Sequence, residues 1–334
     1  MSAKDRLATN NRKILLSEPL PAFGSRQALD ILSGLGEVVI ASRANEEALT
    51  KETRDADALV VRFARITRPI IHNAETLRVI GRTGTGVDNI DVQAATERKI
   101  LVVNVPAVNT VSVVEHTFSL ILALCKKLKE ADETLRSMGW AERERIASEI
   151  VDLKEKTLGI IGLGSIGREV ARIGKAFKMR VIGYDPYLDA EKARETGVEL
   201  TDLRSIMSRS DIVTIHCALT EQTHHLINEQ TLGLMKTSSY LVNCSRGPIV
   251  DEEALVRALR ERRIAGAACD VFEKEPVDLA NPLLKLPNAI LTPHVAGFTR
   301  ETIEKTLVML AEDISRAIRG EKPVNLVNPE ALTA

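Results

Sequence analysis

Three glycines near the middle of the chain have the spacing of a phosphate-binding turn. Gly162, Gly164 and Gly167 form the pattern G-x-G-x-x-G between the apolar run Thr157 to Ile161 and a helical pattern from Ser165 to Lys178. The first glycine permits a tight turn, the second lets a pyrophosphate approach the backbone, and the third lets the helix pack closely on the strand. Because free N–H groups at a helix N-terminus attract anions, the pattern predicts a dinucleotide site.

An acidic residue ends the next apolar run. Asp185 follows Val181 to Tyr184, where its carboxylate can accept hydrogen bonds from the ribose hydroxyls of an adenosine. Its negative charge would repel a 2′-phosphate, so the sequence favours NAD over NADP as the cofactor. The alternative is that the glycines form only a turn in a flavodoxin-like domain.

The elements that must position this turn follow a repeating strand–helix pattern. Helical patterns occur at Ser25 to Ser33, near 110 to 137 and at Thr299 to Arg319. Strands separated by helices form parallel sheets covered on both faces, so we expect two doubly wound α/β units of unequal size. The apolar runs expected to form strands are Lys13 to Ser17, Val38 to Ile40, Ala58 to Arg62, Arg78 to Gly81, Ile100 to Val103, Thr157 to Ile161, Val181 to Tyr184, Asp211 to His216, Tyr240 to Asn243, Ala265 to Cys269 and Ala289 to Leu291.

Composition and charge narrow the class of protein. Of 334 residues 44% are hydrophobic, and 45 basic against 46 acidic side chains give a net charge of -1. This balance gives no electrostatic reason to expect nucleic acid or an anionic membrane as a partner. The polar N-terminus lacks a signal-peptide pattern, and the four cysteines fit neither a zinc site nor a disulfide framework. We therefore expect a cytoplasmic protein with no metal site.

The most apolar stretch, Val111 to Cys125, is too short to cross a membrane and contains Glu115 and His116. It predicts a buried or interface helix. Because Val111 to Leu124 is richer in apolar residues than one packed face needs, we expect a homodimer contact there. The adjacent histidines His224 and His225 have no carboxylate cluster around them in sequence, which argues against a metal hydrolase.

Four further motifs carry a resemblance to a known family. They are Val79 to Asp91 (VIGRTGTGVDNID), Asn243 to Asp251 (NCSRGPIVD), Asp270 to Pro276 (DVFEKEP) and Thr292 to Gly297 (TPHVAG). Together with the glycine turn, these motifs resemble the D-isomer-specific 2-hydroxyacid dehydrogenases over roughly residues 55 to 315. The resemblance implies a Rossmann NAD-binding domain, residues 106–296, inserted into a flavodoxin-like substrate (catalytic) domain formed by residues 1–105 and 297–334.

The resemblance assigns the catalytic roles to Arg246, Glu275 and His294. Reduction of a 2-keto acid requires a group that holds the carboxylate, one that polarises the carbonyl and one that delivers a proton. Arg246 can do the first two with its fixed positive charge, and His294 can supply the proton, or accept it in the oxidation. A carboxylate at Glu275 would favour the protonated imidazole and keep it competent as an acid. NAD(H) carries the hydride, so no metal is needed.

Further contacts follow from the resemblance. Asp270 is expected near the carboxamide of the nicotinamide, and Cys217 stands where Thr or Val is more usual in the family. The complete set of expected cofactor contacts is Gly162, Gly164, Ser165, Ile166, Gly167, Asp185, Thr85, Cys217, Cys244, Ser245, Asp270 and Gly297.

The substrate is expected to be a small anionic 2-hydroxy or 2-keto acid. Arg62, Arg65 and Arg82 follow or end strands, and Gly84 and Thr85 can offer backbone N–H groups to a carboxylate. Basic residues there favour a second anionic group on the substrate, although these arginines could instead be only solvated. Arg246 is expected to bind the same substrate.

The resemblance leans toward 3-phosphoglycerate dehydrogenases, with glyoxylate/hydroxypyruvate reductases as the alternative. Two features depart from the phosphoglycerate pattern: Val-Ala-Gly follows His294, and Trp140 is out of step with the Arg that usually follows it. Because the sequence ends soon after Leu326, we expect no C-terminal serine-sensing domain. An NAD-sensing binding module and a phosphite dehydrogenase are further alternatives; formate dehydrogenases have Gln where Glu275 stands.

Overall fold

The computed structural model describes residues 12–188 and 197–332, and the chain divides into two compact units. One unit consists of residues 1–109 and 299–334, and the other of residues 110–298. Each unit contains a parallel sheet with helices on both faces, which confirms the predicted α/β class. In the described part of the chain no helix is both long and apolar enough to cross a membrane.

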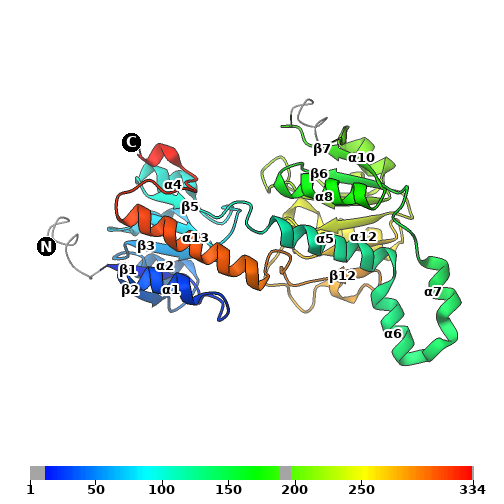
Figure 1. The fold of residues 1–334 in the computed structure, drawn as a ribbon, viewed down its shortest axis with the longest axis horizontal. Helices are drawn as coiled ribbons and strands as arrows, with labels where there is room; N and C mark the ends of the chain where they lie inside the picture. The colour runs from blue at the N-terminus through cyan, green and yellow to red at the C-terminus, as the bar shows by residue number, and fades with distance from the viewer. Residues whose placement is uncertain (1–11, 189–196, 333–334) are drawn as a thin grey trace. The chain divides into compact units, whose positions relative to one another are not determined.

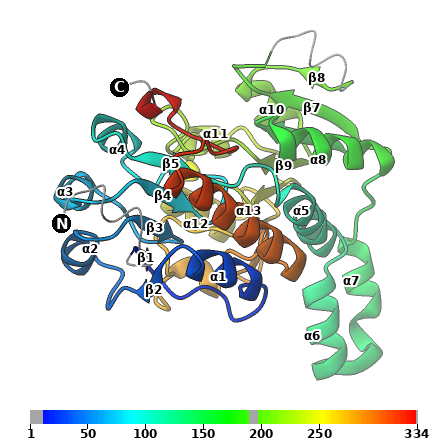
Figure 2. The ribbon, with the colours of Figure 1, turned by 60° about the vertical axis from the view of Figure 1, so that its left-hand side comes forward.

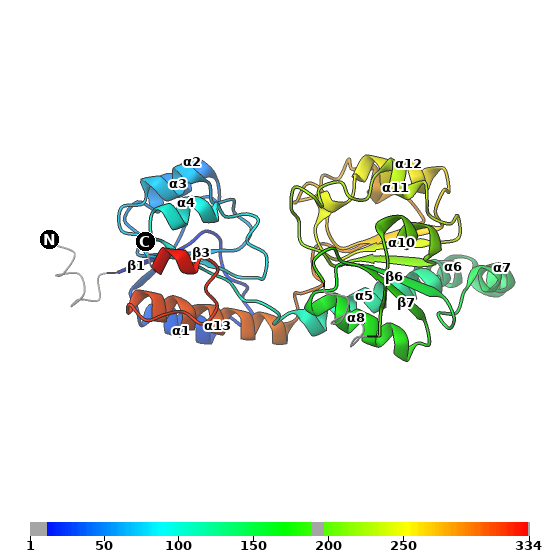
Figure 3. The ribbon, with the colours of Figure 1, turned by 90° about the horizontal axis from the view of Figure 1, so that it is seen from above.

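The first unit contains a five-stranded sheet of order β2-β1-β3-β4-β5. This is the flavodoxin-like order. Helices α1 and α13 cover one face, and α2, α3 and α4 cover the other (Figure 3). A Cβ added to Gly81 in β4 would lie 2.7 Å from Ile314 Cδ1 of α13, so this glycine lets the C-terminal helix pack directly on the sheet. The bounds are β1 Lys13–Leu16, α1 Arg26–Ser33, β2 Glu37–Ile40, α2 Glu46–Glu52, β3 Ala58–Val61, α3 Arg68–Asn73, β4 Val79–Arg82, α4 Val92–Glu97, β5 Leu101–Val103, α13 Arg300–Ile318 and η5 Pro329–Leu332.

The second unit contains a seven-stranded parallel sheet of order β12-β11-β10-β9-β6-β7-β8. The arrangement around β6 is that of a Rossmann fold, in which the strand order reverses at the first strand. Helices α5 and α8 lie on one face, and α10, α11 and α12 on the other (Figure 3). The bounds are α5 Thr110–Cys125, α6 Leu128–Met138, η2 Gly139–Glu142, α7 Arg143–Glu149, β6 Thr157–Ile161, α8 Ser165–Ala176, β7 Arg180–Tyr184, β8 Glu199–Leu200, α10 Leu203–Arg209, β9 Ile212–Ile215, α11 Glu229–Leu232, β10 Tyr240–Asn243, η3 Gly247–Ile249, α12 Glu252–Arg260, β11 Gly266–Cys269, η4 Pro282–Lys285 and β12 Ala289–Leu291.

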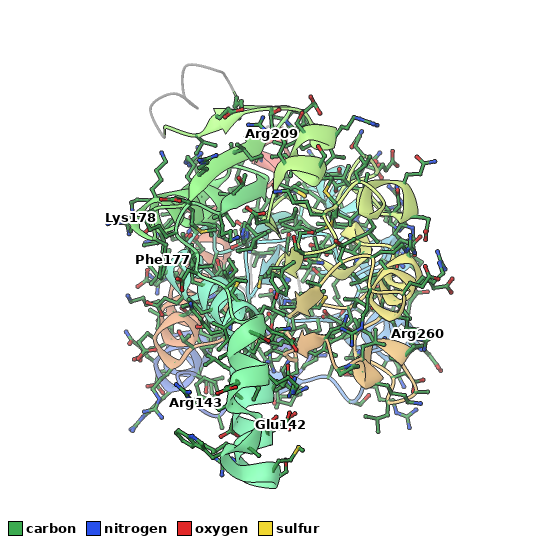
Figure 4. The ribbon with its side chains drawn as sticks, turned by 90° about the vertical axis from the view of Figure 1, so that its right-hand side faces the viewer. Glu142, Arg143, Phe177, Lys178, Arg209 and Arg260 are labelled. Atoms are coloured by element: carbon green, nitrogen blue, oxygen red, sulfur yellow. The ribbon has the colours of Figure 1, made fainter. Side chains whose placement is uncertain are left out.

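The helical pattern expected near 110 to 137 is present, but as two helices, α5 and α6, rather than one. The chain breaks after α5, where Lys127 adopts a left-handed conformation with φ of 52°. Helices α6 and α7 then form a hairpin that projects from the rest of residues 110–298 (Figures 1 and 2). Glu142 and Arg143 lie on this hairpin (Figure 4). Arg145 stabilises it through contacts to Glu130 at 2.8 Å and to Glu142 at 2.7 Å.

Candidate active site

The glycine turn has the geometry that its spacing predicts. Gly162 has φ of +89°, and a Cβ there would lie 2.5 Å from the backbone nitrogen of Cys217. A Cβ on Gly167 would lie 2.0 Å from the oxygen of Gly162, so the first turn of α8 can pack on the loop only with glycine at this position. A Cβ on Gly164 would have no heavy atom within 4 Å. Open space therefore faces Gly164, where the pattern predicts the approach of a pyrophosphate.

Asp185 is held beside this turn. Its Oδ2 accepts a hydrogen bond of 2.8 Å from the N–H of Leu163, and its Oδ1 accepts one of 3.0 Å from the N–H of Tyr187. The acid at the end of β7 is therefore fixed to the glycine turn at the start of α8. Helix α8 has no side-chain cap at Gly164, so its first N–H groups have no capping acceptor from that residue. These features fit an adenosine diphosphate group bound at the turn.

His294 and Glu275 form a direct pair. His294 Nδ1 lies 2.7 Å from Glu275 Oε2, and Glu275 Oε1 accepts a hydrogen bond of 3.1 Å from the N–H of Phe272. Both side chains are about one-third exposed, His294 at 35% and Glu275 at 33%. Burial raises the pKa of Glu275, but the hydrogen bond from His294, the charges of His294 and Arg246, and the Phe272 N–H outweigh it, so the pKa is lowered. Because Nδ1 of His294 contacts Glu275, the other ring nitrogen, Nε2, points away from Glu275.

A buried carboxylate shapes the loop that carries His294. Asp270 is 1% exposed and accepts hydrogen bonds from the N–H groups of Val295 at 2.9 Å and Ala296 at 2.8 Å and from the hydroxyl of Thr292 at 2.5 Å. Its own carbonyl accepts the N–H of His294 at 2.7 Å. These bonds hold His294 in a left-handed conformation, with φ of 53°. Both carboxylate oxygens of Asp270 have protein donors, and its expected contact with the cofactor stays a prediction.

His116 extends this network and was not expected from the sequence to be near the site. Its Nε2 lies 3.0 Å from Thr292 Oγ1 and 3.6 Å from Asp270 Oδ1. His116 therefore connects helix α5 to the His294 loop. The only signal in the sequence was that Glu115 and His116 interrupt an apolar stretch, which does not reveal a partner far along the chain.

The loop of Arg246 contacts the loop of Glu275 through backbone atoms. A Cβ on Gly247 would lie 1.8 Å from the oxygen of Phe272, so only glycine permits this approach. Asn243 Nδ2 donates to the oxygen of Arg246 at 2.9 Å, and the Arg246 Nη1 donates to the oxygen of Ser245 at 2.9 Å. The three residues expected to be catalytic thus follow β10, β11 and β12, at the carboxyl ends of neighbouring strands where open α/β sheets bind ligands.

The cysteines near these loops are not reactive thiolates. Burial raises the pKa of Cys217 to about 11 and that of Cys244 to about 12. Both thiols therefore stay neutral at physiological pH, which is consistent with apolar contacts rather than nucleophilic chemistry. Cys217 lies against Gly162, and its carbonyl accepts a hydrogen bond from the hydroxyl of Ser245. In the described part of the chain no group of three or more His, Cys, Asp or Glu residues could hold a metal ion.

Four residues predicted to bind the substrate, Arg62, Arg65, Gly84 and Thr85, lie in the first unit, whereas the predicted cofactor contact Gly297 lies in the second. Arg62 donates to the oxygen of Pro19 at 2.7 Å and lies over the ring of Phe63, while Arg65 is exposed. Burial lowers the pKa of Arg62, an effect that the charge of Glu18 opposes. Thr85 Oγ1 donates to the oxygen of Val105 at 3.1 Å, next to Gly84.

Glu18 is a residue that the sequence did not single out. Its carboxylate accepts the N–H groups of Arg62 at 3.2 Å, Phe63 at 3.0 Å and Ala64 at 2.6 Å. It therefore fixes the loop after β3 that carries the predicted substrate arginines. Glu18 follows β1, which lies next to β3 in the sheet, and this explains the contact. No local sequence pattern predicts it.

Residues 118–296 match the family model described as D-isomer specific 2-hydroxyacid dehydrogenase, NAD binding domain. The chain belongs to this family. It is 45% identical over 318 residues to a D-3-phosphoglycerate dehydrogenase of Methanocaldococcus jannaschii, which covers 95% of this chain and 59% of that protein. It is 42% identical over 317 residues to a glyoxylate reductase of Aeropyrum pernix, which covers 92% of this chain and 94% of that protein.

Solved structures of the family have the same fold. A D-lactate dehydrogenase of Aquifex aeolicus, complexed with NAD and lactic acid, superposes with a TM-score of 0.85 at 29% identity, covering 95% of this chain and 99% of that chain. The comparison confirms the predicted Rossmann type of the NAD-binding domain. The chain spans only 59% of the length of two D-3-phosphoglycerate dehydrogenase relatives, from Methanocaldococcus jannaschii and Archaeoglobus fulgidus.

Proposed function

We propose that this family member is an NAD-dependent dehydrogenase that interconverts a small D-2-hydroxy acid and its 2-keto acid. The observation that carries the proposal is the His294–Glu275 contact of 2.7 Å at the carboxyl ends of the Rossmann strands. A histidine oriented by a carboxylate is suited to move one proton to or from a substrate oxygen. NAD(H), when bound, supplies or accepts the hydride.

The residues of the second unit fit this cofactor. Gly164 leaves open space where the pyrophosphate would lie, and Asp185, fixed to Leu163, would accept hydrogen bonds from the adenosine ribose. Ser165, Ile166 and Gly167 begin α8, whose N-terminus would face the phosphates.

In the proposed reaction, three side chains act on the substrate. Arg246 binds its carboxylate and polarises the adjacent carbonyl. His294 donates a proton through Nε2 to the oxygen on C2 during reduction and removes it during oxidation. Glu275 holds His294 through Nδ1 and so fixes the orientation of the imidazole ring.

For the substrate we propose 3-phosphoglycerate and phosphohydroxypyruvate. The support is the similarity to D-3-phosphoglycerate dehydrogenases and the arginines Arg62 and Arg65 at the end of β3, whose charges suit a second anionic group. Glyoxylate or hydroxypyruvate reduction is the second candidate, favoured by the glyoxylate reductase that matches over 94% of its own length.

We also propose a homodimer, with the contact at a different place from the one expected. Most apolar side chains of helix α5 are buried in the core of the second unit, so they are not available for a contact with a second copy. The exposed apolar side chains lie instead on the α6–α7 hairpin: Leu128 at 56%, Leu135 at 54%, Met138 at 60% and Trp140 at 74%. An exposed apolar stripe of this kind on a projecting element fits a second copy of the chain. A cytoplasmic location stays a prediction, based on the spacing of the four cysteines in the sequence.

The test follows NADH absorbance with phosphohydroxypyruvate, hydroxypyruvate, glyoxylate and pyruvate as substrates. We expect turnover of one or more of them, strongest with phosphohydroxypyruvate, and loss of turnover in the Arg246→Ala variant. NADH binding without turnover of any 2-keto acid would contradict the proposed activity and favour the NAD-sensing module.

A further inference from the structure

A second histidine–carboxylate pair lies in the loop that carries Glu275. His225 Nε2 contacts Glu273 Oε1, and Glu273 precedes Glu275 by two residues. The ring of His224 stacks on that of His225, with centroids 4.1 Å apart and an interplanar angle of 29°. The side chains are partly shielded, with His225 39% and Glu273 32% exposed. The proposed chemistry uses neither residue.

The main chain of His225 is fixed to the loop of Arg246. Its N–H donates to the oxygen of Pro248 at 2.9 Å, and the N–H of Ile227 donates to the oxygen of Ile249 at 3.0 Å. Ile227 and Val250 form a parallel bridge that continues this pairing. The side chain of His225 therefore extends from the segment paired with the Arg246 loop to the Glu275 loop.

Glu273 is one of the points at which the Glu275 loop is held from outside. Its N–H donates to Glu252 Oε2 at 3.3 Å, at the first residue of α12, and Glu252 Oε1 accepts Asn281 Nδ2 at 2.6 Å. The bond from the Phe272 N–H to Glu275 lies within the loop itself. One long backbone hydrogen bond to Glu252 and the side-chain contact with His225 therefore connect Glu273 to the residues outside its loop.

We propose that His225 is a positioning residue, which holds the Glu275 loop against the Arg246 loop through Glu273 and thereby keeps Glu275 in contact with His294. The effect on turnover rests on the proposed dehydrogenase function, whereas the effect on the His294–Glu275 contact does not. His225 touches neither substrate nor cofactor in this role. Because His225 acts through a loop, it changes the fraction of molecules in which His294 and Glu275 are in contact, and not the chemistry that the two residues perform.

The kinetic test is a double-mutant cycle of His225→Ala, Glu273→Ala and the combined variant, with the substrate that the wild type turns over. We expect each single change to lower kcat by about three- to tenfold, with the KM for NADH unchanged and the double variant no slower than either single one. His225→Gln, which can still donate to Glu273, should recover most of the loss. Arg209→Ala is the matched control, because Arg209 at the end of α10 (Figure 4) forms an exposed pair with Glu199 at 2.7 Å.

The second measurement needs no substrate. In protein labelled with ¹⁵N-histidine, six histidines give ring signals. The signals of His294 are identified as those that disappear in a His294→Gln variant. We expect His225→Ala and Glu273→Ala to shift or broaden the His294 Nδ1 signal, while Arg209→Ala leaves it in place. A wild-type His294 signal in both variants would overturn the inference even if the enzyme is active. Multiplicative losses of kcat in the double variant would also overturn it. If the wild type is inactive but the His294 signal is shifted in the His225→Ala and Glu273→Ala variants, the proposed function is refuted and the positioning role is supported.

Discussion

Gly247 is the position where a single methyl group should separate the proposed catalytic residues. A Cβ there would lie 1.8 Å from the Phe272 oxygen and 2.5 Å from the Glu273 nitrogen. Both neighbours are backbone atoms, so no side-chain rotation can relieve the overlap. Reaching an ordinary contact of about 3.5 Å requires the two loops to separate by more than about 1 Å. Arg246 and Glu275 lie on the opposite sides of this contact and would separate with them.

A displacement of about 1 Å in a catalytic arrangement costs about a hundredfold in rate. We therefore expect Gly247→Ala to lower kcat/KM by about two orders of magnitude and to destabilise the fold by about 1–3 kcal/mol. NADH affinity should stay within about threefold, because the glycine turn at Gly162 and Gly164 is made by different loops. Steady-state kinetics, NADH fluorescence titration and thermal melting measure the three quantities.

Gly233→Ala is the matched control. A Cβ there would lie 3.2 Å from the oxygen of Glu229, a tight contact but not an overlap, and Gly233 follows α11 in the same unit. It should retain near wild-type activity. A Gly247→Ala enzyme with more than half of the wild-type kcat/KM would refute the argument that backbone contact between these loops sets the distance between Arg246 and Glu275.

Three further predictions concern charge and exposure. The pKa of Glu275 is lowered from its ordinary 4.5, so its charged form should stabilise the folded state above that value. That contribution should be lost as the pH falls through the lowered pKa. Urea titrations from pH 7 to pH 3 should therefore show Glu275→Gln less stable than the wild type at neutral pH, with the two converging in acid; a constant difference across this range would contradict the assignment. Asp185→Asn removes the charge but keeps an acceptor for Leu163, and it should improve the ratio of NADPH to NADH kcat/KM by about tenfold or more; an unchanged ratio would mean that Asp185 does not face the ribose. Leu135→Lys with Met138→Lys should turn a sedimenting dimer into a monomer at micromolar concentration without a large change in Tm, because both side chains are more than half exposed; a variant that stays dimeric would place the interface elsewhere.

Local patterns in the sequence determined most of the fold. Each expected strand is present to within one residue at either end, because short apolar runs between helical patterns are read directly from the chain. The two-residue strand β8, Glu199–Leu200, was missed because it is too short and too polar to form an apolar run. The break at Lys127 was also missed, since a lysine with positive φ has no sequence signature.

The residues of the candidate site also divide into those that the sequence predicts and those that only the folded structure reveals. The glycine turn and Asp185 could be predicted because their spacing lies within one strand–helix–strand unit. Glu18, His116 and His225 could not, because their partners lie on strands or loops that only the folded sheet brings together. The homodimer contact was expected on α5 because an apolar helix does not reveal whether its surplus faces meet the core or solvent.

The measurement that tests the central claim most directly is the fate of the transferred hydrogen. Wild-type protein is incubated with phosphohydroxypyruvate and NADH that carries two deuterium atoms at C4 of the nicotinamide, and the 2-hydroxy acid formed is analysed by chiral chromatography and mass spectrometry. The proposed mechanism predicts one deuterium at C2 of a single enantiomer, and loss of product in His294→Gln. Product without deuterium, or equal product in His294→Gln, would contradict it.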